Sequence, residues 1–265
     1  MIAKLYIKTG MRGNITFLEQ AYNTHPFKVA NITEDKKDVT LRLMLMSSSP
    51  GVLDGDTYRM KIDIAKSCSL DLKTQSYQRL FNMKTGASQH LEVQLKEEAS
   101  FCYLPHPCVP HRSSVFSVHN KVLLSDHCRL IWGEVLTCGR KLNGEVFLFS
   151  KFHSKTEIFL NDKLLIKENI LVRPSIIDIN AIGQLEGYTH QATLIYLSEK
   201  ADTLLLISRI TTFLSGNNDI SFGITAAPIN GIILRILGFK AEELFNYLNI
   251  IASTFLISKQ TEYAV

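Results

Sequence analysis

The stretch from Val39 to Ala65 reads VTLRLMLMSSSPGVLDGDTYRMKIDIA and contains two runs in which apolar and polar residues alternate. In the first run, the apolar side chains on one face are Val39, Leu41, Leu43 and Leu45. In the second run, they are Tyr58, Met60, Ile62 and Ile64. Successive side chains of a strand point to opposite faces, so each run predicts a strand with one buried face. Pro50-Gly51 between the runs predicts a turn.

The same alternation recurs along the rest of the chain, in short runs separated by Gly, Asn, Asp, Ser and Lys. These runs cover residues 91–95, 115–118, 128–135, 145–149, 189–197, 203–207 and 232–237. Many short strands at near-regular spacing indicate a mainly β fold, arranged as a sandwich, a barrel or a β-helical stack. No linker rich in Pro or Gly divides the 265 residues, so we expect a single domain over residues 1–265.

Two segments have the spacing of helices. The clearer one is Ala241 to Leu256, in which apolar residues recur every three or four positions, at Leu244, Phe245, Leu248, Ile251 and Phe255. Glu242 and Glu243 lie in its first turn, where negative charge is favourable. A second segment runs from Pro174 to Glu186. We therefore expect a small helical element at the C-terminal end of the β domain.

Composition restricts both the location of the protein and its class. Hydrophobic residues make up 46% and charged residues 20%, which suits a packed core. The net charge of +4 comes from scattered basic residues, whereas a nucleic-acid binder concentrates them in a patch. No stretch approaches the roughly 18 apolar residues of a membrane span, and the first residues lack the apolar core of a signal peptide. We expect a cytoplasmic protein with five reduced cysteines, bound to neither nucleic acid nor membrane.

Asp54 and Asp56 are the first candidate site residues, and they flank Gly55. On an extended segment their carboxylates would lie roughly 7 Å apart on one face, a separation found in inverting glycosidases. In a turn, the same two aspartates would cap and tighten the backbone around the glycine. The spacing alone favours the turn.

Glu134 and Glu145 are the second pair of candidates, within Cys128–Phe147, CRLIWGEVLTCGRKLNGEVF. We expect one strand to end near Glu134, a turn to begin at Gly139-Arg140 and another strand to begin at Gly144-Glu145. The two glutamates would then project toward a common space. The alternative is an ordinary hairpin with solvated charges.

The segment CYLPHPCVPH, residues 102–111, has the residue types that bind zinc or nickel: Cys102, His106, Cys108 and His111. His127 and Cys128 follow it. The spacing matches no standard structural zinc pattern, and three prolines stiffen the segment. A packed loop with buried cysteines is therefore the favoured interpretation.

Several sequence signatures of enzymes are missing from the chain. It has no GxxxxGK[ST] phosphate loop, no HExxH, no GxSxG and no GxGxxG. We expect a protein that is not an enzyme and that relies on a partner for any nucleotide energy.

Taken in order, these segments resemble the UreD family of urease accessory proteins, called UreH in some species and closest here to the UreH form. Ser49-Pro50-Gly51 with Gly55-Asp56 resembles the family's SPGG…GD signature, although Val52 replaces the second glycine. Residues 134–147 resemble its E…GR…GE signature, through Glu134, Gly139-Arg140 and Gly144-Glu145. Between them, Thr74-Gln75-Ser76, Arg79, Phe81 and Leu104-Pro105 also fit in order. The resemblance covers roughly residues 40–150.

The resemblance implies a stacked β-helical, sandwich-like domain with a small C-terminal helical element. It implies a chaperone in metalloenzyme maturation that forms a complex with an all-helical accessory protein of the UreF type, a GTPase of the UreG type and apo-urease. It also implies nickel insertion into urease, with Ni²⁺ in transit and no tightly bound cofactor.

A protein that passes nickel on must bind it weakly. Thiolate and multi-histidine cages hold nickel strongly, whereas carboxylates and water hold it loosely. We therefore expect Asp56, Glu134 and Glu145, with Asp54 secondary, to guide Ni²⁺ along an internal water-filled path. The apolar face of residues 241–256 has two interpretations: it covers the β core, or it docks the helical accessory protein.

Three other function classes remain as alternatives. A polysaccharide hydrolase using Asp54 and Asp56 predicts secretion and an aromatic-lined groove, but the chain has one tryptophan, Trp132. A metal-storage or metal-sensing protein using the cysteines and histidines predicts tight stoichiometric binding. A conformational chaperone of urease would work without touching nickel.

Overall fold

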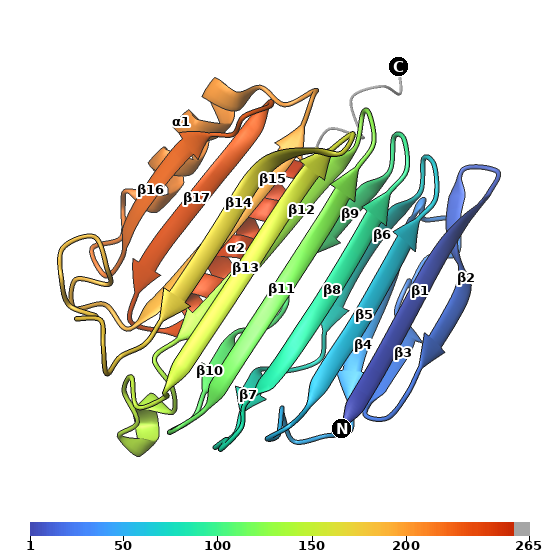
Figure 1. The fold of residues 1–265 in the computed structure, drawn as a ribbon. Helices are drawn as coiled ribbons and strands as arrows, with labels where there is room; N and C mark the ends of the chain where they lie inside the picture. The colour runs from blue at the N-terminus through green and yellow to red at the C-terminus, as the bar shows by residue number, and fades with distance from the viewer. Residues whose placement is uncertain (257–265) are drawn as a thin grey trace.

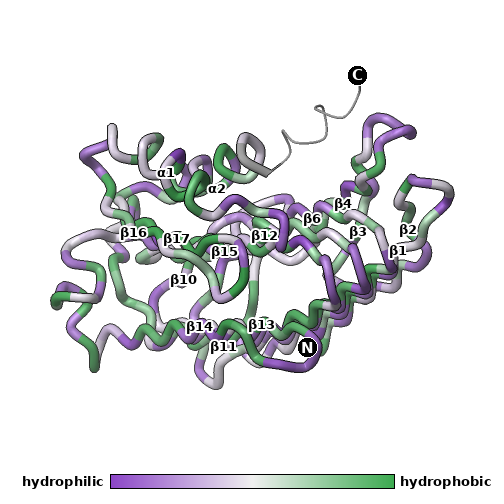
Figure 2. The backbone as a smooth tube through the Cα atoms, turned by 90° about the horizontal axis from the view of Figure 1, so that it is seen from above, coloured by the Kyte–Doolittle hydropathy of each residue, from purple (hydrophilic) through white to green (hydrophobic). Residues whose placement is uncertain are grey.

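The computed structural model describes the backbone of residues 1–256 and the side chains of residues 1–254. Within these residues the strands form a seven-stranded and a ten-stranded sheet, which face each other, and two α-helices cover the outer face of the second (Figures 1 and 2). The view from above in Figure 2 shows the three layers, with the first sheet, the second sheet and the helices in that order.

The strands of each sheet come from distant parts of the chain. The first sheet contains, in spatial order, β14 (Lys163–Val172), β13 (Lys151–Leu160), β11 (Val115–Leu124), β8 (Ala87–Leu95), β5 (Thr57–Ile64), β1 (Ile2–Arg12) and β2 (Ile15–Asn23). The second contains β16 (Ser221–Ala226), β17 (Gly231–Gly238), β15 (His190–Ser198), β12 (Arg129–Thr137), β9 (Ser100–Tyr103), β6 (Ser69–Thr74), β4 (Thr40–Ser47) and β3 (Phe27–Asn31). Two short strands, β7 (Gln78–Leu80) and β10 (Cys108–Pro110), pair with each other, and β10 also pairs with β12.

The middle of the chain winds between the two sheets. From β4 to β13, successive long strands alternate between the second sheet and the first, and neighbours within each sheet run parallel. Antiparallel pairs close the two ends of this stack. The structure therefore confirms a mainly β fold of stacked, facing sheets with a C-terminal helix, α2 (Ala241–Leu256).

The alternating runs of the sequence bury the faces that they predict. Leu41, Leu43 and Leu45 of β4 and the even-numbered apolar residues of β5 belong to the core between the two sheets. The N-terminal strands β1 to β3 were not among the predicted runs, although Ala3, Leu5 and Ile7 alternate in the same way.

A second core lies between the second sheet and the helices. Leu244, Leu248 and Ile251 of α2 are buried there, beside Leu194 and other residues of β15 and β17. The apolar face of residues 241–256 therefore covers the β core, and its buried residues are not available for docking a partner in this packing. Phe245 is partly buried against the same core, and the side chain of Phe255 lies outside the described residues.

Three segments differ from the sequence predictions. Residues 203–207 begin a helix, α1 (Thr203–Leu214), whose first turn is capped by Asp202 accepting a hydrogen bond from Leu205 N at 3.0 Å. Residues 174–186 form successive turns instead of a helix, because side chains such as Asp178 bind nearby backbone N–H groups. Residues 145–149 are not a strand, since Phe147 has a positive φ of 53° and the chain bends there.

Within the described residues, we find no helix whose length and apolar character would allow it to cross a membrane.

Gly133 of β12 allows α2 to pack closely on the second sheet. A Cβ at this position would lie 2.4 Å from Leu104 Cδ2 and 3.2 Å from Leu248 Cδ1. We expect Gly133→Ala to lower the free energy of unfolding by about 1 to 3 kcal/mol, the usual cost of overpacking a filled core. Urea unfolding followed by circular dichroism measures this change.

Gly223→Ala is the matched control, since a Cβ on Gly223 of β16 would meet no described atom within 4 Å. We expect this variant to unfold like the unmodified protein. Equal stability of the two variants would contradict the close packing of α2 on β12.

Candidate functional site

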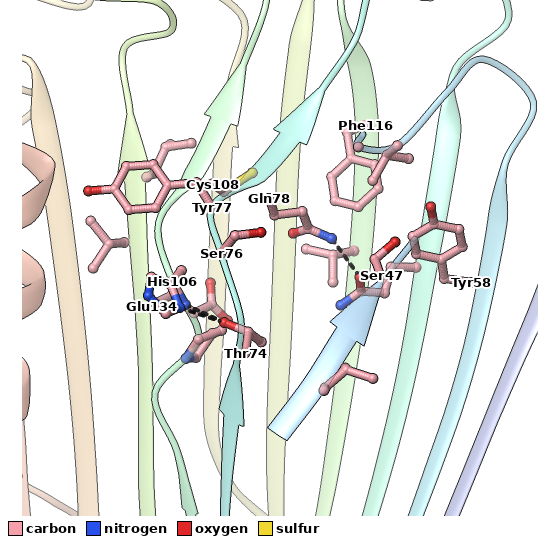
Figure 3. A pocket seen from close by; sticks show the side chains of 18 of the residues that line it. Ser47, Tyr58, Thr74, Ser76, Tyr77, Gln78, His106, Cys108, Phe116 and Glu134 are labelled. Atoms are coloured by element: carbon pink, nitrogen blue, oxygen red, sulfur yellow. Dashed lines mark hydrogen bonds between the residues drawn. The ribbon is translucent and has the colours of Figure 1, made fainter. Parts of the chain in front are cut away.

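A cavity with both polar and apolar lining residues lies between the two sheets, with a volume of about 160 Å³. Its lining comes from strands of both sheets and from the loops that join them, and Figure 3 shows Tyr58, Gln78, Phe116 and Glu134 around it. A space of this size holds several water molecules, because one water needs roughly 10 to 15 Å³ of such volume. The cavity is the main candidate for a functional site.

The register of the strands makes this part of the interior polar. In the first sheet, Leu91, Asn120 and Thr156 occupy one row across β8, β11 and β13. In the second sheet, Glu134 of β12 pairs with Thr193 of β15. The next inward row of the first sheet is apolar, with Val93, Val122 and Ile158. The polar groups thus lie on this row and on the neighbouring one, which holds Tyr58, Gln89 and Ser154.

Glu134 is held at the centre of this polar level. Its Oε1 accepts hydrogen bonds from Thr156 Oγ1 at 2.9 Å, Asn120 Nδ2 at 3.1 Å and Trp132 Nε1 at 3.2 Å. Its Oε2 accepts one from Ser154 Oγ at 2.8 Å. The donors lie on β11, β12 and β13, so both sheets fix the position of the carboxylate. Since Oε1 accepts three of these bonds and Oε2 accepts one, Oε2 keeps a lone pair that it can offer to water or to a cation.

Three buried hydroxyl groups have no hydrogen-bond partner within the described part of the chain: Tyr58 OH, Ser114 Oγ and Thr193 Oγ1. Tyr58 and Thr193 line the cavity. Burial raises the pKa of Tyr58 to about 12, so its hydroxyl keeps its proton at neutral pH. Buried polar groups are almost always satisfied, so these two hydroxyls indicate that water or a polar ligand occupies the cavity.

A second, smaller space of about 10 Å³ adjoins Glu134 on the side of β14 and β15. Glu168 of β14 lines this space together with Glu134 and Thr193. Glu168 Oε1 and Oε2 accept hydrogen bonds from Arg235 Nη2 of β17 at 2.8 and 2.6 Å. Glu168 was not among the site residues predicted from the sequence, although its place between Ile166 and Ile170 marks it as a charged residue on an inward face.

Asp54 and Asp56, the first candidate site residues, cap a turn. Asp54 Oδ1 accepts hydrogen bonds from Thr85 Oγ1 and Gly86 N, both at 2.8 Å, and these bonds lower the pKa of Asp54 to about 2. Asp56 is buried, and its Oδ2 accepts a hydrogen bond from Leu53 N at 2.9 Å. Neither aspartate is part of the cavity lining. Both aspartates therefore stabilise a turn, which is the interpretation that their spacing favours.

Glu145 is also held by local partners. It forms an ion pair with Arg140, with Arg140 Nε donating to Oε2 at 2.8 Å, and it accepts a hydrogen bond from Arg112 N at 3.2 Å. The hydrogen bond from Arg140 is the main reason that the pKa of Glu145 falls to about 2. Of the four predicted acids, all within the described residues, Glu134 alone lines the cavity.

The glycines of both sequence signatures allow close approach of the backbone at corners of the stack. A Cβ on Gly51 would lie 2.4 Å from the carbonyl oxygen of Arg79. A Cβ on Gly139 would lie 2.9 Å from the carbonyl oxygens of Glu145 and Pro110. Gly55 and Gly144 lie in the neighbouring turns, and Ser49, Pro50 and Gly51 line one end of the cavity. The residues of the two signatures therefore form close-packed turns, and one of these turns borders the cavity.

The cysteines of residues 102–111 are protonated and separate. Cys108 lines the cavity, whereas Cys102 packs toward the core beneath the helices. Burial raises the pKa of both thiols. Among the described residues, no three His, Cys, Asp or Glu side chains lie close enough together to hold a metal ion.

The histidines of the same segment have separate structural contacts. His106 Nδ1 lies 3.0 Å from Thr74 Oγ1 (Figure 3), and its ring packs on Phe245 with 4.7 Å between centroids. His111 is buried with its ring edge-on to that of Phe81. This arrangement corresponds to the packed, proline-rich loop that the spacing favours.

Comparison with known proteins identifies similar sequences over almost the whole chain. A sequence model of the family described as UreD urease accessory protein matches residues 2–261. The chain is 47% identical over 247 residues to urease accessory protein UreD of Flavobacterium johnsoniae, a match that covers 93% of this chain and 89% of that protein. It is 32% identical over 250 residues to the protein of the same name from Acetivibrio thermocellus, covering 94% and 95% of the two chains. It is 34% identical over 255 residues to that of Haemophilus influenzae Rd, covering 91% and 98%.

The ion pair of Glu145 predicts a pH-dependent contribution to stability. Because the pKa of Glu145 in the folded protein, about 2, lies below its ordinary value of 4.5, the contribution is fully present above pH 4.5. It is lost as the pH falls from 4.5 toward 2. We expect Glu145→Gln to lower the melting temperature at pH 7 and to have no effect near pH 2, as measured by thermal unfolding across this range.

Glu34→Gln, at an exposed position, serves as the control and should change the melting temperature little at either pH. An unchanged melting temperature of Glu145→Gln at pH 7 would show that Arg140 does not stabilise the corner through Glu145.

Proposed function

This chain belongs to the UreD family of urease accessory proteins, and we propose that it acts in urease maturation by passing Ni²⁺ through the cavity between its two sheets. The observation that best supports this proposal is the position of Glu134, a carboxylate fixed by donors from β11, β12 and β13 beside a cavity with two unpartnered hydroxyls.

The chemistry of the lining suits weak, transient binding. Its polar groups are mainly oxygen donors, from Glu134, Gln89, Asn120 and the hydroxyls of Tyr58 and Thr193. Such ligands hold Ni²⁺ less tightly than imidazole or thiolate, so they would let the ion leave again. His106 and Cys108 also line the cavity. His106 Nδ1 is in contact with Thr74 Oγ1 at 3.0 Å, and burial raises the pKa of the Cys108 thiol, which makes it a poor metal ligand. The cavity would therefore guide nickel without trapping it.

The family membership supports a set of partners for this step. We propose that the chain scaffolds an all-helical accessory protein of the UreF type and a GTPase of the UreG type on apo-urease. The chain itself has no GxxxxGK[ST] sequence, so nucleotide hydrolysis would be the task of the GTPase. In this complex the chain would act as a maturation factor without catalytic activity of its own.

A conformational chaperone that never contacts nickel is the second candidate. The exposed apolar side chains of Leu142, Ile182 and Leu204 favour it, because exposed apolar surface often marks sites of protein contact. Asp54, Asp56 and Glu145 are consistent with it too, since each serves a turn or corner. The two candidates differ in what they require of Glu134.

Replacing Glu134 with glutamine tests the nickel pathway. Glutamine keeps the size of the side chain and a hydrogen-bond acceptor but removes the charge that attracts a cation. We expect Glu134→Gln to lower the nickel content and activity of urease matured at limiting Ni²⁺ by at least tenfold. Both quantities are measured on urease purified from cells that carry the variant.

Glu157→Gln is the matched control. Glu157 is on β13 beside Thr156, but its side chain contacts His119 and Lys155 instead of the cavity. This variant should give urease with full nickel content. If Glu134→Gln protein that still associates with apo-urease also gave full nickel content, the pathway would be excluded and the conformational chaperone favoured.

A further inference from the structure

We propose that apo-urease docks on one end of the β stack, where four loops bring exposed aliphatic side chains and cations together, and that it does so through acidic residues arranged around apolar ones. This inference rests on the proposed function, in which the chain assembles on apo-urease. The loops are residues 53–56, 81–86, 111–114 and 139–150, which lead into β5, β8, β11 and β13 of the first sheet (Figure 1). We call their exposed side chains the corner surface.

Backbone hydrogen bonds hold the four loops side by side. Gly55 N donates to Gly86 O at 2.9 Å, Met83 N donates to Ser113 O at 3.3 Å, and Ser113 N donates to Leu148 O at 2.9 Å. Each loop is thus bonded to the next, although the loops are far apart in the sequence. Their exposed side chains therefore form one continuous surface with a fixed order.

The apolar part of the corner surface is aliphatic. Leu142 is fully exposed, and Leu53, Leu148 and Val146 are 45%, 41% and 39% exposed. Apolar side chains gathered on one exposed surface mark a place of contact with a partner. Aliphatic groups offer no flat ring on which a nucleic-acid base could stack, so the surface suits a protein better than a nucleic acid.

Positive charge prevails on the corner surface. Two of the acids in the loops are internal to the fold, because Asp56 is buried and Glu145 pairs with Arg140. The other charged residues of the four loops are exposed, and they are Asp54, Lys84, Arg112 and Lys141. A partner surface that carries carboxylates would be attracted to this excess of cations.

Two of these cations have no counter-ion of their own. Within residues 1–254, no ion pair involves Lys84 or Arg112. The neighbouring acid, Asp54, directs its Oδ1 to Thr85 and Gly86 and holds the turn. Lys84 and Arg112 are therefore the groups that a carboxylate of the partner would meet.

The main cavity reaches the surface beside the first of the four loops. Pro50 and Gln75 line the cavity and are exposed, and Pro50 shortly precedes Leu53 in the chain. A protein seated on the corner surface would lie near this opening. In the proposed function apo-urease receives what the cavity carries, and the family is described by its service to urease. Both points favour apo-urease as the occupant.

A bilayer with anionic headgroups is the alternative occupant, since cations beside aliphatic side chains also suit a lipid surface. Peripheral binding to membranes commonly uses an amphipathic helix that lies in the interface. Within the four loops the helical structure is a single short turn, η1 (Lys141–Asn143). The rigid, hydrogen-bonded arrangement of the loops favours a protein partner of fixed shape.

Reversing the two unpaired cations tests the docking surface. We would immobilise apo-urease on a biosensor and record association and dissociation of the full chain at about 0.1 M and about 1 M NaCl, where the Debye length is about 10 and 3 Å. We expect Lys84→Glu combined with Arg112→Glu to slow association about tenfold or more at the lower salt, because steering by charge is lost. The difference should shrink at the higher salt.

Lys163→Glu combined with Lys200→Glu is the matched control. Both lysines are exposed, they lie at the opposite end of the stack, and their reversal changes the net charge by the same amount. This variant should associate like the unmodified chain. Leu142→Ser tests the apolar part and should speed dissociation about threefold or more at both salts. Its side chain is fully exposed, so folding does not depend on it, and thermal unfolding of every variant checks this.

Slower association of the Lys84 and Arg112 variant, but not of the control, supports docking on the corner surface. Equal association of these two variants would overturn the corner surface and leave the proposed function intact. Absence of any binding of the unmodified chain to apo-urease would instead overturn the proposed function. Vesicles of phosphatidylcholine and phosphatidylglycerol are the second probe: loss of vesicle binding in the variant, with unchanged binding to apo-urease, would assign the surface to lipid and overturn the proposal.

Discussion

Every polar group that the two sheets bury between them must find a partner across the gap, and this constraint organises the interior. At most levels of the stack the inward residues are apolar and the constraint does not arise. At the level of Glu134 it is met by donors on three strands, and the donors come from both sheets. The hydroxyls of Tyr58 and Thr193 are left for water or ligand. The way in which this polar level is completed therefore decides where water, and Ni²⁺ in our proposal, can lie between the sheets.

The acidic residues have different roles, and these roles follow from the same constraint. Asp54, Asp56 and Glu145 are at corners, where backbone N–H groups and Arg140 occupy their oxygens. Glu134 and Glu168 are on strands, face inward and share one small space. Acids at corners stabilise the turns that let the chain wind between the sheets, and acids on strands give the interior its charge. The acidic signatures of the chain thus combine residues that hold corners with Glu134, which lines the cavity.

The sequence predicted much of the fold, because inward residues such as Leu43 and Ile62 alternate strictly with polar ones. It failed at residues 203–207, where the apolar run TLLLI has no clear period, and at residues 145–149, where a positive φ at Phe147 ends any extended run. The alternation of apolar and polar residues did not predict the cavity. Three of the four partners of Glu134 are 14 to 22 positions away, and only the registers of β11 and β13 bring them to it.

The central claim is that Ni²⁺ occupies the space beside Glu134. Anomalous diffraction at the nickel absorption edge, from crystals of the full chain soaked with Ni²⁺, tests it most directly. The account predicts a difference peak inside the cavity, within coordination distance of Glu134 and surrounded by oxygen atoms. Nickel found only at surface histidines such as His90 and His119, with no peak between the sheets, would contradict it.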